Sequence, residues 1–348
     1  MAPTIRDVAK RANVAPSTVS AVLNSKGYIH PDTFARVQKA IRDLEYTPRR
    51  SARNLTQQVS GNIGFIVHDA HFNQAEPFYT RVFLGAELKA REYDLYVLLS
   101  TVPERYSARN DLPRFLLEHN VDGIIIAGSV PRKVILDVLN YKLPMVLVDF
   151  GDDEMNVSRV LIENRLGTKR ATQHLIEQGI ENIGYIGASD GHPSERERFS
   201  GFTEAINEAG VPLHADWIDH EEKDTRTENG IVAFERMWNR GARPRGMVCF
   251  NDAIALGVMR AADRLGVHVP DDLAVVGFDD VEVAGLVSPS LSTVRVFKEE
   301  LGVAAVQTIT DMIDHPDRKP VTSRVGVEFV ARKSSFVNHL IRNTSDET

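Results

Sequence analysis

Apolar residues recur at helical spacing near the start of the chain. In residues 4–12, TIRDVAKRA, they form a single stripe that consists of Ile5, Val8, Ala9 and Ala12. Thr4 and Asp7 stand three residues apart at the head of this stripe, which is the spacing of a capping box. The pattern predicts a short helix that begins just after Thr4.

A second helix is expected directly afterwards. The run 13–16, NVAP, breaks the first helix, and its proline suits the first turn of a new helix that ends at about Asn24. Val19, Val22 and Leu23 have the spacing to face inward in this helix. The outward positions near its start are then small or weakly polar.

A glycine turn leads to a third helix, which is expected over about 31–44. Its apolar side is expected to consist of Phe34, Val37, Ile41 and Leu44. Three short helices, the first two joined by a tight turn, predict a helix-turn-helix.

From residue 63 onward, short apolar runs alternate with amphipathic stretches. The runs expected as strands are 63–67, 95–99, 123–128, 144–150, 183–188, 246–252 and 273–280. The helical stretches between them include 79–91, 165–178, 198–209 and 253–265. Apolar strands separated by helical crossovers predict parallel sheets that are covered on both faces, and the length fits two such sheets. The expected fold is an all-α head followed by an α/β core of two parallel-sheet lobes.

The charges are divided unevenly along the chain. The net charge is −7, yet residues 1–60 hold 10 Lys and Arg against 4 Asp and Glu, while the remainder holds 31 against 44. A basic head on an acidic body is expected when one small domain contacts nucleic acid. Small helical domains are also often basic by chance, so charge alone leaves both interpretations open.

Composition indicates an ordinary globular protein, with 43% hydrophobic and 26% charged residues. No run of 18 apolar residues predicts a membrane span, and the N-terminal MAPTIRDVAKRA has no apolar region that would act as a signal peptide. Cys249 is the single cysteine, which excludes an intrachain disulfide framework and suits a buried thiol in a reducing compartment. We therefore expect a cytoplasmic location.

Polar residues follow several of the predicted strands at their carboxyl ends. These residues are Asp149, His192, Ser194, Asn251, Asp252 and Asp279, and Arg198 lies one turn beyond Ser194. Ligands of open α/β sheets bind at this edge. Carboxylates, an amide and an arginine suit a ligand with many hydroxyl groups, such as a sugar, and would also suit a purine or nucleoside.

Each of these carboxylates, taken singly, is also explained as a helix cap or a surface ion pair. Asp252 and Asp280 fit helix N-terminal caps better than ligand contacts.

Two other classes of protein are open at this point. The chain has no GxGxxG after a strand, no GxxxxGK[ST], no HExxH and no nucleophile elbow, which argues against an enzyme. A free sugar-binding protein would need export, and the basic helical head stands where its signal peptide would be.

Three stretches together resemble one known family. The run TIRDVAKRANVAPSTVSAVLN, followed by YTPRRSARNL and then IGFIV, is similar to the LacI/GalR family of bacterial transcription repressors. The resemblance covers about residues 4–333 and is most specific over the first 65. It implies a DNA-binding head, a hinge and a periplasmic-binding-protein-like core that binds a small-molecule effector.

The resemblance also implies domain boundaries. The head is expected at 1–47, the hinge at 48–60, the core at 61–336 and a polar tail at 337–348. Within the core, the N-lobe is expected at about 61–162 and 293–322. The C-lobe is expected at about 163–292 and 323–336.

By this resemblance the second helix is the recognition helix. Pro16, Ser17 and Ala21 match the positions that contact bases, while Thr18, Ser20 and Asn24 lie nearer the phosphates. Thr18 and Asn24 are also explained as residues that only cap or satisfy backbone. Thr4 completes the set of DNA-binding residues expected in the head.

This helix departs from the usual family pattern. Ala15 stands where a serine commonly caps the helix, and loss of such a cap costs about 1 kcal/mol. Ala21 stands where many members carry a long polar or basic side chain. Pro16 and Ala21 can only touch thymine methyl groups or pack, so this helix forms few hydrogen bonds with bases.

The hinge then becomes the expected source of specificity. In the family, the segment that matches residues 50–57 becomes helical on the operator, and paired leucines wedge into the minor groove. Leu55 matches that leucine, Ala52 matches a small residue that lets two such helices approach, and Arg53 suits a phosphate or minor-groove contact. An ordinary linker residue is the alternative for Leu55.

In the core, the resemblance assigns the strongest effector contacts to Arg198, Asn251 and Asp279. Phe78 and Tyr79 match a loop that lies over the ligand, and Phe297 matches an aromatic wall. Ser129, Glu163 and Thr227 match less specific contact positions. No cofactor or metal is implied.

The implied mechanism is a homodimer on a pseudopalindromic operator, one head on each half-site. Closure of the lobes around the effector would alter the hinge segments and thereby the affinity for DNA. A sugar or sugar derivative is the favoured effector, with a purine or nucleoside as the alternative. The expected location is the bacterial cytoplasm, in association with the nucleoid.

Because the recognition helix offers so few hydrogen bonds to bases, Leu55→Ala is expected to weaken operator binding more than Ser17→Ala. The wedge selects deformable base steps, which cost a few kcal/mol to unstack, whereas one serine hydroxyl contributes about 1 kcal/mol. A binding titration at one fixed salt concentration compares the two variants. A larger loss for Ser17→Ala contradicts this hypothesis.

Overall fold

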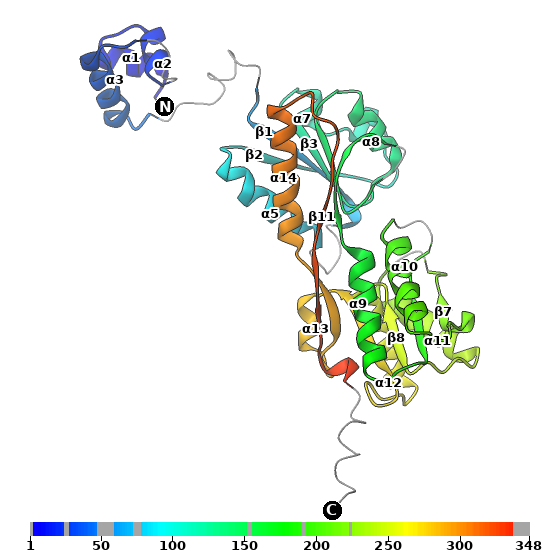
Figure 1. The fold of residues 1–348 in the computed structure, drawn as a ribbon. Helices are drawn as coiled ribbons and strands as arrows, with labels where there is room; N and C mark the ends of the chain where they lie inside the picture. The colour runs from blue at the N-terminus through cyan, green and yellow to red at the C-terminus, as the bar shows by residue number, and fades with distance from the viewer. Residues whose placement is uncertain are drawn as a thin grey trace, which may run out of the picture. The chain divides into compact units, whose positions relative to one another are not determined.

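The computed structural model describes residues 3–23, 28–46, 59–71, 78–151, 155–189, 193–222 and 225–336. The chain divides into two compact units, Met1–Gly61 and Asn62–Thr348 (Figure 1). Five residues with expected functional roles lie outside the described residues: Asn24, Ala52, Arg53, Leu55 and His192.

The first unit contains three helices around a small apolar core. The helices are α1 (Ile5–Ala12), α2 (Pro16–Leu23) and α3 (Pro31–Asp43), which confirms the three predicted helices. Their core consists of Val8, Ala9, Ala12, Val19, Val22, Val37, Ala40 and Tyr46.

The predicted capping box is present at the start of α1. The Thr4 hydroxyl accepts from the Asp7 backbone N–H at 3.4 Å, and the Asp7 carboxylate accepts from the Thr4 backbone N–H at 2.8 Å. The hydrogen bond from the Thr4 hydroxyl lowers the pKa of Asp7. The expectation for Phe34 was wrong, because this side chain is 45% exposed and the buried stripe of α3 is formed by Val37 and Ala40.

The second unit contains two six-stranded sheets, each the centre of one lobe. The N-lobe sheet has the order β11-β5-β4-β3-β1-β2, and all its pairings are parallel. Its strands are β1 (Asn62–His68), β2 (Tyr96–Val102), β3 (Gly123–Ala127), β4 (Met145–Val148), β5 (Ser158–Ile162) and β11 (Thr322–Val325). Its helices are α5 (Phe78–Glu92), α6 (Ala108–Asp111), α7 (Arg114–Leu117), α8 (Arg132–Leu139) and α14 (Lys298–Asp314), and a 3-10 turn, η1, spans Asp69–His71.

The C-lobe sheet has the order β12-β10-β9-β8-β6-β7 and is parallel except for the β10–β12 pair. Its strands are β6 (Ile183–Ile186), β7 (Ile218–Asp219), β8 (Gly246–Cys249), β9 (Ala274–Asp279), β10 (Ser292–Val296) and β12 (Val327–Val330). Its helices are α9 (Asn164–Glu177), α10 (Pro193–Glu208), α11 (Thr227–Asn239), α12 (Asp252–Arg264) and α13 (Glu282–Leu286), with 3-10 turns η2 (Ala215–Trp217) and η3 (Lys333–Ser335). The two-lobed α/β core predicted from the apolar runs is thereby confirmed.

In the described part of the chain, three segments cross between the lobes: β5 to α9, β10 to α14, and β11 to β12 (Figure 1). The expected lobe boundaries at residues 293 and 323 fall inside strands. β10 pairs with β9 and therefore belongs to the C-lobe through Val296, while β11 pairs with β5 and belongs to the N-lobe through Val325. Both boundaries, which the resemblance implies only approximately, were set too early, because sheet pairing decides where each strand belongs.

Two glycines fix the crossing of α5 and α14 in the N-lobe. A Cβ added at Gly85 would lie 2.0 Å from the Glu299 carbonyl oxygen, and one at Gly302 would lie 2.0 Å from the Val82 carbonyl oxygen. Only glycine permits backbones to approach this closely. The start of α14, next to the β10 crossover, is therefore held firmly against the N-lobe.

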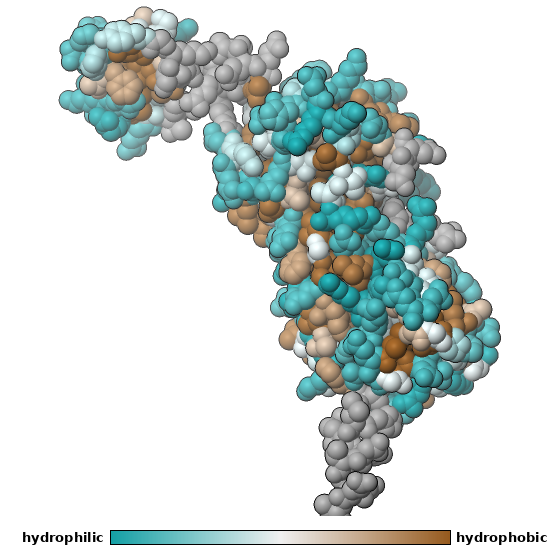
Figure 2. Space-filling view, viewed as in Figure 1, coloured by the Kyte–Doolittle hydropathy of each residue, from teal (hydrophilic) through white to brown (hydrophobic). Residues whose placement is uncertain are grey.

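The face of the molecule seen in Figure 2 is largely hydrophilic, with apolar residues in scattered groups. Within the described residues, no helix is long and apolar enough to cross a membrane.

Candidate functional site: a helix-turn-helix surface and a cleft between two lobes

The recognition helix predicted from the sequence presents the expected side chains outward. Pro16 and Ser17 are exposed, and Thr18, Ser20 and Ala21 are partly exposed. Val19 and Val22 of the same helix are buried in the head core. The sequence thus divides α2 into an apolar inner side and a small, weakly polar outer side.

Thr4 has a structural role in the described head. Its hydroxyl donates to the Asp7 carboxylate at 2.7 Å as part of the capping box. The side chain is exposed, so a contact with a phosphate would have to share this hydroxyl.

On the N-lobe side of the cleft, Asp149 follows β4 and Tyr79 lies in the first turn of α5. The Tyr79 hydroxyl donates to Asp149 Oδ2 at 2.8 Å, and both residues are 7% exposed. Asp149 Oδ1 is buried and has no hydrogen-bond partner in the described part of the protein. Burial raises the pKa of Asp149 to about 7, although Arg198 and the hydrogen bond from Tyr79 act in the opposite direction.

On the C-lobe side, the Arg198 side chain of α10 lies between two aromatic rings. Its guanidinium carbon is 3.8 Å from the centre of the Phe278 ring and 4.5 Å from that of Phe250. Nε donates to Asn164 Oδ1 at 2.9 Å, and Nη1 donates to the Phe250 carbonyl at 2.6 Å. Cation–π contact and directed hydrogen bonds thus hold a guanidinium that is only 4% exposed.

Asp279, at the end of β9, faces the same guanidinium. Arg198 Nη2 lies 3.6 Å from Asp279 Oδ1, which is within ion-pair distance but forms no hydrogen bond. Burial raises the pKa of Asp279, while Arg198 and Lys298 lower it. The φ angles of Asp149 and Asp279 are +64° and +108°, values that non-glycine residues rarely adopt and that are common at ligand sites.

A cavity of about 590 Å³ extends from this cleft toward the β5 and β11 crossovers. Asp149, Asn164 and Ser194 line it, together with four arginines: Arg159, Arg165, Arg196 and Arg324. Arg324 of the N-lobe forms a bidentate ion pair with Glu197 of the C-lobe, at 2.7 and 3.2 Å. The cavity is large enough for a sugar or a nucleobase.

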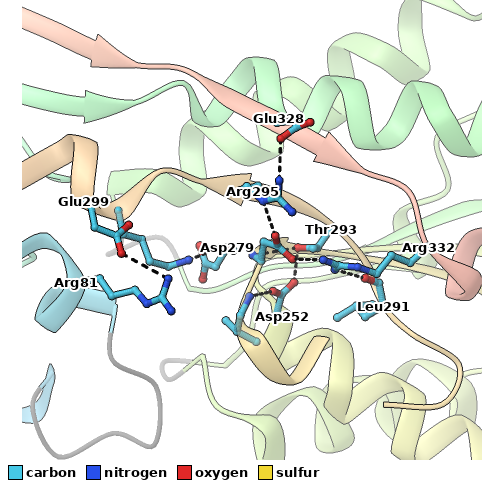
Figure 3. Close-up of polar contacts among 12 residues, drawn as sticks. Arg81, Asp252, Asp279, Leu291, Thr293, Arg295, Glu299, Glu328 and Arg332 are labelled. Carbon is cyan, nitrogen blue, oxygen red and sulfur yellow. Dashed lines mark hydrogen bonds and ion pairs between the residues drawn. The ribbon is translucent and has the colours of Figure 1, made fainter. Parts of the chain in front are cut away.

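Two aspartates expected to cap helices instead form a buried network in the C-lobe (Figure 3). Asp252 accepts from the Val281 N–H at 2.9 Å and from the Thr293 hydroxyl. Asp280 accepts from Arg295 at 2.7 Å and from Arg332 at 2.6 Å. Thr293 and Arg295 lie in β10, and Arg332 follows β12, so these partners are distant in the sequence and the caps predicted from local sequence were wrong. The network holds the loop that follows Asp279.

The true cap of α12 is Asn251, which the sequence assigns to the effector. Its side-chain oxygen accepts from the Ile254 N–H at 2.9 Å, and its Nδ2 donates to the Thr225 carbonyl at 3.1 Å. Each amide atom keeps one further hydrogen-bonding capacity for a ligand.

The remaining expected contacts are spread around the cleft. Phe78 begins α5, Ser129 is exposed after β3, and the partly buried Phe297 packs against the apolar core just before α14. Among the expected contacts, Asp149, Glu163 and Ser194 line the cavity. The expected contacts that are not among its lining residues are Phe78, Tyr79, Ser129, Arg198, Asn251, Asp279, Phe297 and Thr227.

Three residues of this region were not predicted from the sequence to lie at the site. Asn164 bonds Arg198, and His71 packs against Tyr79 with ring centres 4.4 Å apart; burial lowers the pKa of His71 to about 4. Lys298, the first residue of α14, donates to the Asp279 carbonyl. Of these three residues, Lys298 follows directly after Phe297, an expected effector contact, and this position could have indicated that it lies near the cleft.

The cleft contains both hydrogen-bond acceptors and donors. The Asp149 and Asp279 carboxylates can each accept further hydrogen bonds, and Arg198 and Lys298 are donors. Such a set suits a polar molecule. Of these four residues only Asp149 also lines the cavity. Within the described residues, no group of histidine, cysteine and carboxylate side chains has the geometry to hold a metal ion.

Comparison with known proteins identifies the family. Residues 4–49 match the model for bacterial regulatory proteins of the lacI family, and residues 172–335 match that for a periplasmic binding protein-like domain. The chain is 32% identical over 336 residues to the HTH-type transcriptional repressor PurR of Actinobacillus pleuropneumoniae serotype 3, with 95% of this chain and 98% of the relative covered. The chain belongs to the LacI family.

Another LacI-family relative is the ribose operon repressor of Halalkalibacterium halodurans. It is 32% identical over 336 residues, with 95% of this chain and 97% of the relative covered. These relatives are repressors rather than enzymes.

Solved structures of LacI-family regulators share the fold along nearly the whole chain. The lac repressor dimer bound to operator and the anti-inducer ONPF is 25% identical, with a TM-score of 0.80 and coverage of 97% of this chain and 100% of that one. The transcriptional regulator CelR in complex with cellobiose is 28% identical, with a TM-score of 0.71 and coverage of 95% and 99%. The LacI-family assignment makes this chain a ligand-responsive, DNA-binding transcriptional regulator.

The raised pKa of Asp149 predicts a stability difference that depends on pH. Its pKa is about 7 in the folded protein and about 3.9 when unfolded, so the folded state binds the extra proton between these values. As pH rises from 5 to 7, the wild type should lose stability relative to Asp149→Asn by about 1.4 kcal/mol per pH unit. Urea unfolding of both proteins at pH 5, 6, 7 and 8 measures this difference.

Glu204→Gln is the matched control. The Glu204 carboxylate accepts a hydrogen bond from Lys169, which lowers the pKa of Glu204, and the lysine stays charged over pH 5–8, so the effect of this variant should be constant over that range. A constant difference between the wild type and Asp149→Asn over the same range would show that Asp149 is ionised throughout.

Proposed function

We propose that this LacI-family chain is a repressor that binds a pseudopalindromic operator as a homodimer, and that a small molecule in the cleft between the lobes changes its affinity for that operator. The observation that carries this proposal is the buried Arg198–Asp279 pair beside Asp149, whose Oδ1 has no partner in the described chain. A core that served only to stabilise the fold gains little from such a site, because unpaired buried polar atoms cost stability.

The head supports the DNA-binding part. Pro16 and Ser17 stand exposed at the start of α2, with Thr18, Ser20 and Ala21 beside them. The excess of Lys and Arg in residues 1–60 provides the attraction to phosphates. We place the site of action on chromosomal DNA in the cytoplasm.

Apolar side chains on the N-lobe support the dimer. Leu84 and Leu88 of α5 are 48% and 49% exposed, and Tyr96 and Leu99 of the edge strand β2 are 64% and 39% exposed. Twofold pairing would bury these side chains against their copies. The lac repressor, to which this chain is similar, forms a dimer on its operator.

The effector is a small polar molecule, with a sugar or sugar derivative favoured over a purine or nucleoside. The acceptors Asp149 and Asp279 and the donor Arg198 match hydroxyl groups, which both donate and accept. Similarity to the ribose operon repressors and to the CelR–cellobiose complex supports a sugar as the effector. Similarity to the PurR repressors leaves a purine as the alternative effector.

Arg198→Met tests the proposal. The operator is first selected from a random DNA library, and a panel of sugars, sugar phosphates and purines is screened by thermal shift. Arg198→Met removes the ion pair with Asp279 but keeps an unbranched side chain between the rings. We expect its operator affinity without ligand to stay within threefold of the wild type. Its response to the panel member that binds the wild type should weaken at least tenfold, which is about 1.4 kcal/mol.

Arg243→Met provides the matched control, because the Arg243 guanidinium also stacks on an aromatic ring, that of Trp238, at 3.8 Å, but it lies on the exposed surface of the C-lobe. This variant should respond as the wild type does. An unchanged ligand response in Arg198→Met would contradict the assigned site, and operator affinity that no panel ligand alters would contradict the regulatory role.

A further inference from the structure

Lys298 is a buried cation at the point where β10 crosses into α14. The residue is only 5% exposed, and its Nζ donates a hydrogen bond to the backbone carbonyl of Asp279. The close crossing of α14 and α5 at Gly302 holds this end of the helix in place. Lys298 therefore belongs to the N-lobe helix but contacts the C-lobe strand that carries Asp279.

No carboxylate among the described residues lies within ion-pair distance of the Lys298 ammonium. The neighbouring carboxylate, Glu299, points to Arg81 instead, with a separation of 3.5 Å (Figure 3). The ring of Phe78, 5.4 Å from Nζ, supplies a cation–π contact. An ammonium group has three donors, and one backbone carbonyl and one aromatic ring contact it directly. The Asp279 carboxylate interacts with it from beyond ion-pair distance and also faces Arg198, so it compensates the charge only in part.

A buried charge that is only partly compensated destabilises a fold. Replacing such a charge by an apolar side chain is often neutral or stabilising. A lysine kept in this environment is therefore better explained by a bound partner than by a contribution to stability.

The position of Lys298 decides what that partner is. Its contacts, the Asp279 carbonyl and the Phe78 ring, come from opposite sides of the interlobe cleft. Lys298 and Arg198 are two buried cations at this cleft, and they face two buried carboxylates, Asp149 and Asp279. Burial favours the neutral form of Asp149 and thereby reduces the negative charge that faces these cations.

We propose that Lys298 binds an anionic oxygen of the effector, so that the ligand is an acidic or phosphorylated small molecule and not a neutral sugar or purine. The hydroxyl groups of the same ligand would meet Asp149, Asp279 and Arg198. This inference rests on the proposed function, since it assigns chemistry to the cleft in which the effector binds.

Binding measurements on matched pairs of ligands test it. The pairs are ribose with ribose 5-phosphate, and glucose with both glucose 6-phosphate and gluconate; inorganic phosphate and hypoxanthine complete the set. Titration calorimetry on the full-length protein should show at least one anionic ligand binding ten times more tightly than its neutral parent. Glucose 6-phosphate and gluconate distinguish a phosphate from a carboxylate.

In Lys298→Met the anionic ligand and its neutral parent should bind with about equal affinity. Lys298→Arg should retain most of the preference for the anion. Lys89→Met is the matched control, because the Lys89 ammonium lies 5.5 Å from the Tyr93 ring but forms an ion pair with Glu92 on the outside of α5. It should keep the full preference. Without ligand, Lys298→Met should melt at or above the temperature of the wild type.

Three results would overturn the inference. One is a ligand set in which no anion binds more tightly than its neutral parent. Another is a Lys298→Met variant that keeps the preference, and the third is a lowered melting temperature for that variant, which would mark Lys298 as a structural residue. Failure of the proposed function is separate: the anion would bind through Lys298 while operator affinity stayed unchanged.

Discussion

The contact between the Arg198 guanidinium and the Asp279 carboxylate is the constraint on which the cleft depends. Two phenylalanine rings, the Asn164 oxygen and a backbone carbonyl hold the guanidinium on the C-lobe side, and the loop after Asp279 is fixed by the buried network of Asp252 and Asp280. Because these supports come from several elements, the two charges are held in position by the protein itself. Preorganised charges of this kind favour specific binding, since the protein has already met the cost of orienting them.

The same cleft links the two lobes. Lys298 of α14 contacts the Asp279 carbonyl, and Arg324 of β11 pairs with Glu197 of α10, so both contacts join the N-lobe to the C-lobe close to a crossover. A ligand that changes either contact therefore changes the relation of the lobes. That is the physical basis for an effect on a DNA-binding head elsewhere in the same chain, because a ligand shifts an equilibrium only by its differential affinity for the two states.

Much of the fold was predictable from apolar periodicity, but only part of the site was. The seven apolar runs correspond to strands, but β5, β7, β10, β11 and β12 are not among them. In β5 and β11, polar residues such as Arg159 and Arg324 interrupt the apolar pattern. Asp149 and Asp279 could each be placed at the carboxyl edge of a parallel sheet. They belong to different sheets, however, so local sequence does not show that the two edges face each other. The burial of Lys298 and the partners of Asp252 depend on tertiary contacts between distant segments, which local sequence does not encode.

Reciprocal binding tests the central claim most directly. The affinity of the protein for its operator is measured with and without the tightest ligand of the sugar and purine panel, and the affinity for that ligand is measured with and without operator. If the cleft regulates the head, the two ratios are equal and differ from one by about 5- to 150-fold, as linkage requires. A ligand affinity that is the same on free and operator-bound protein would contradict the account.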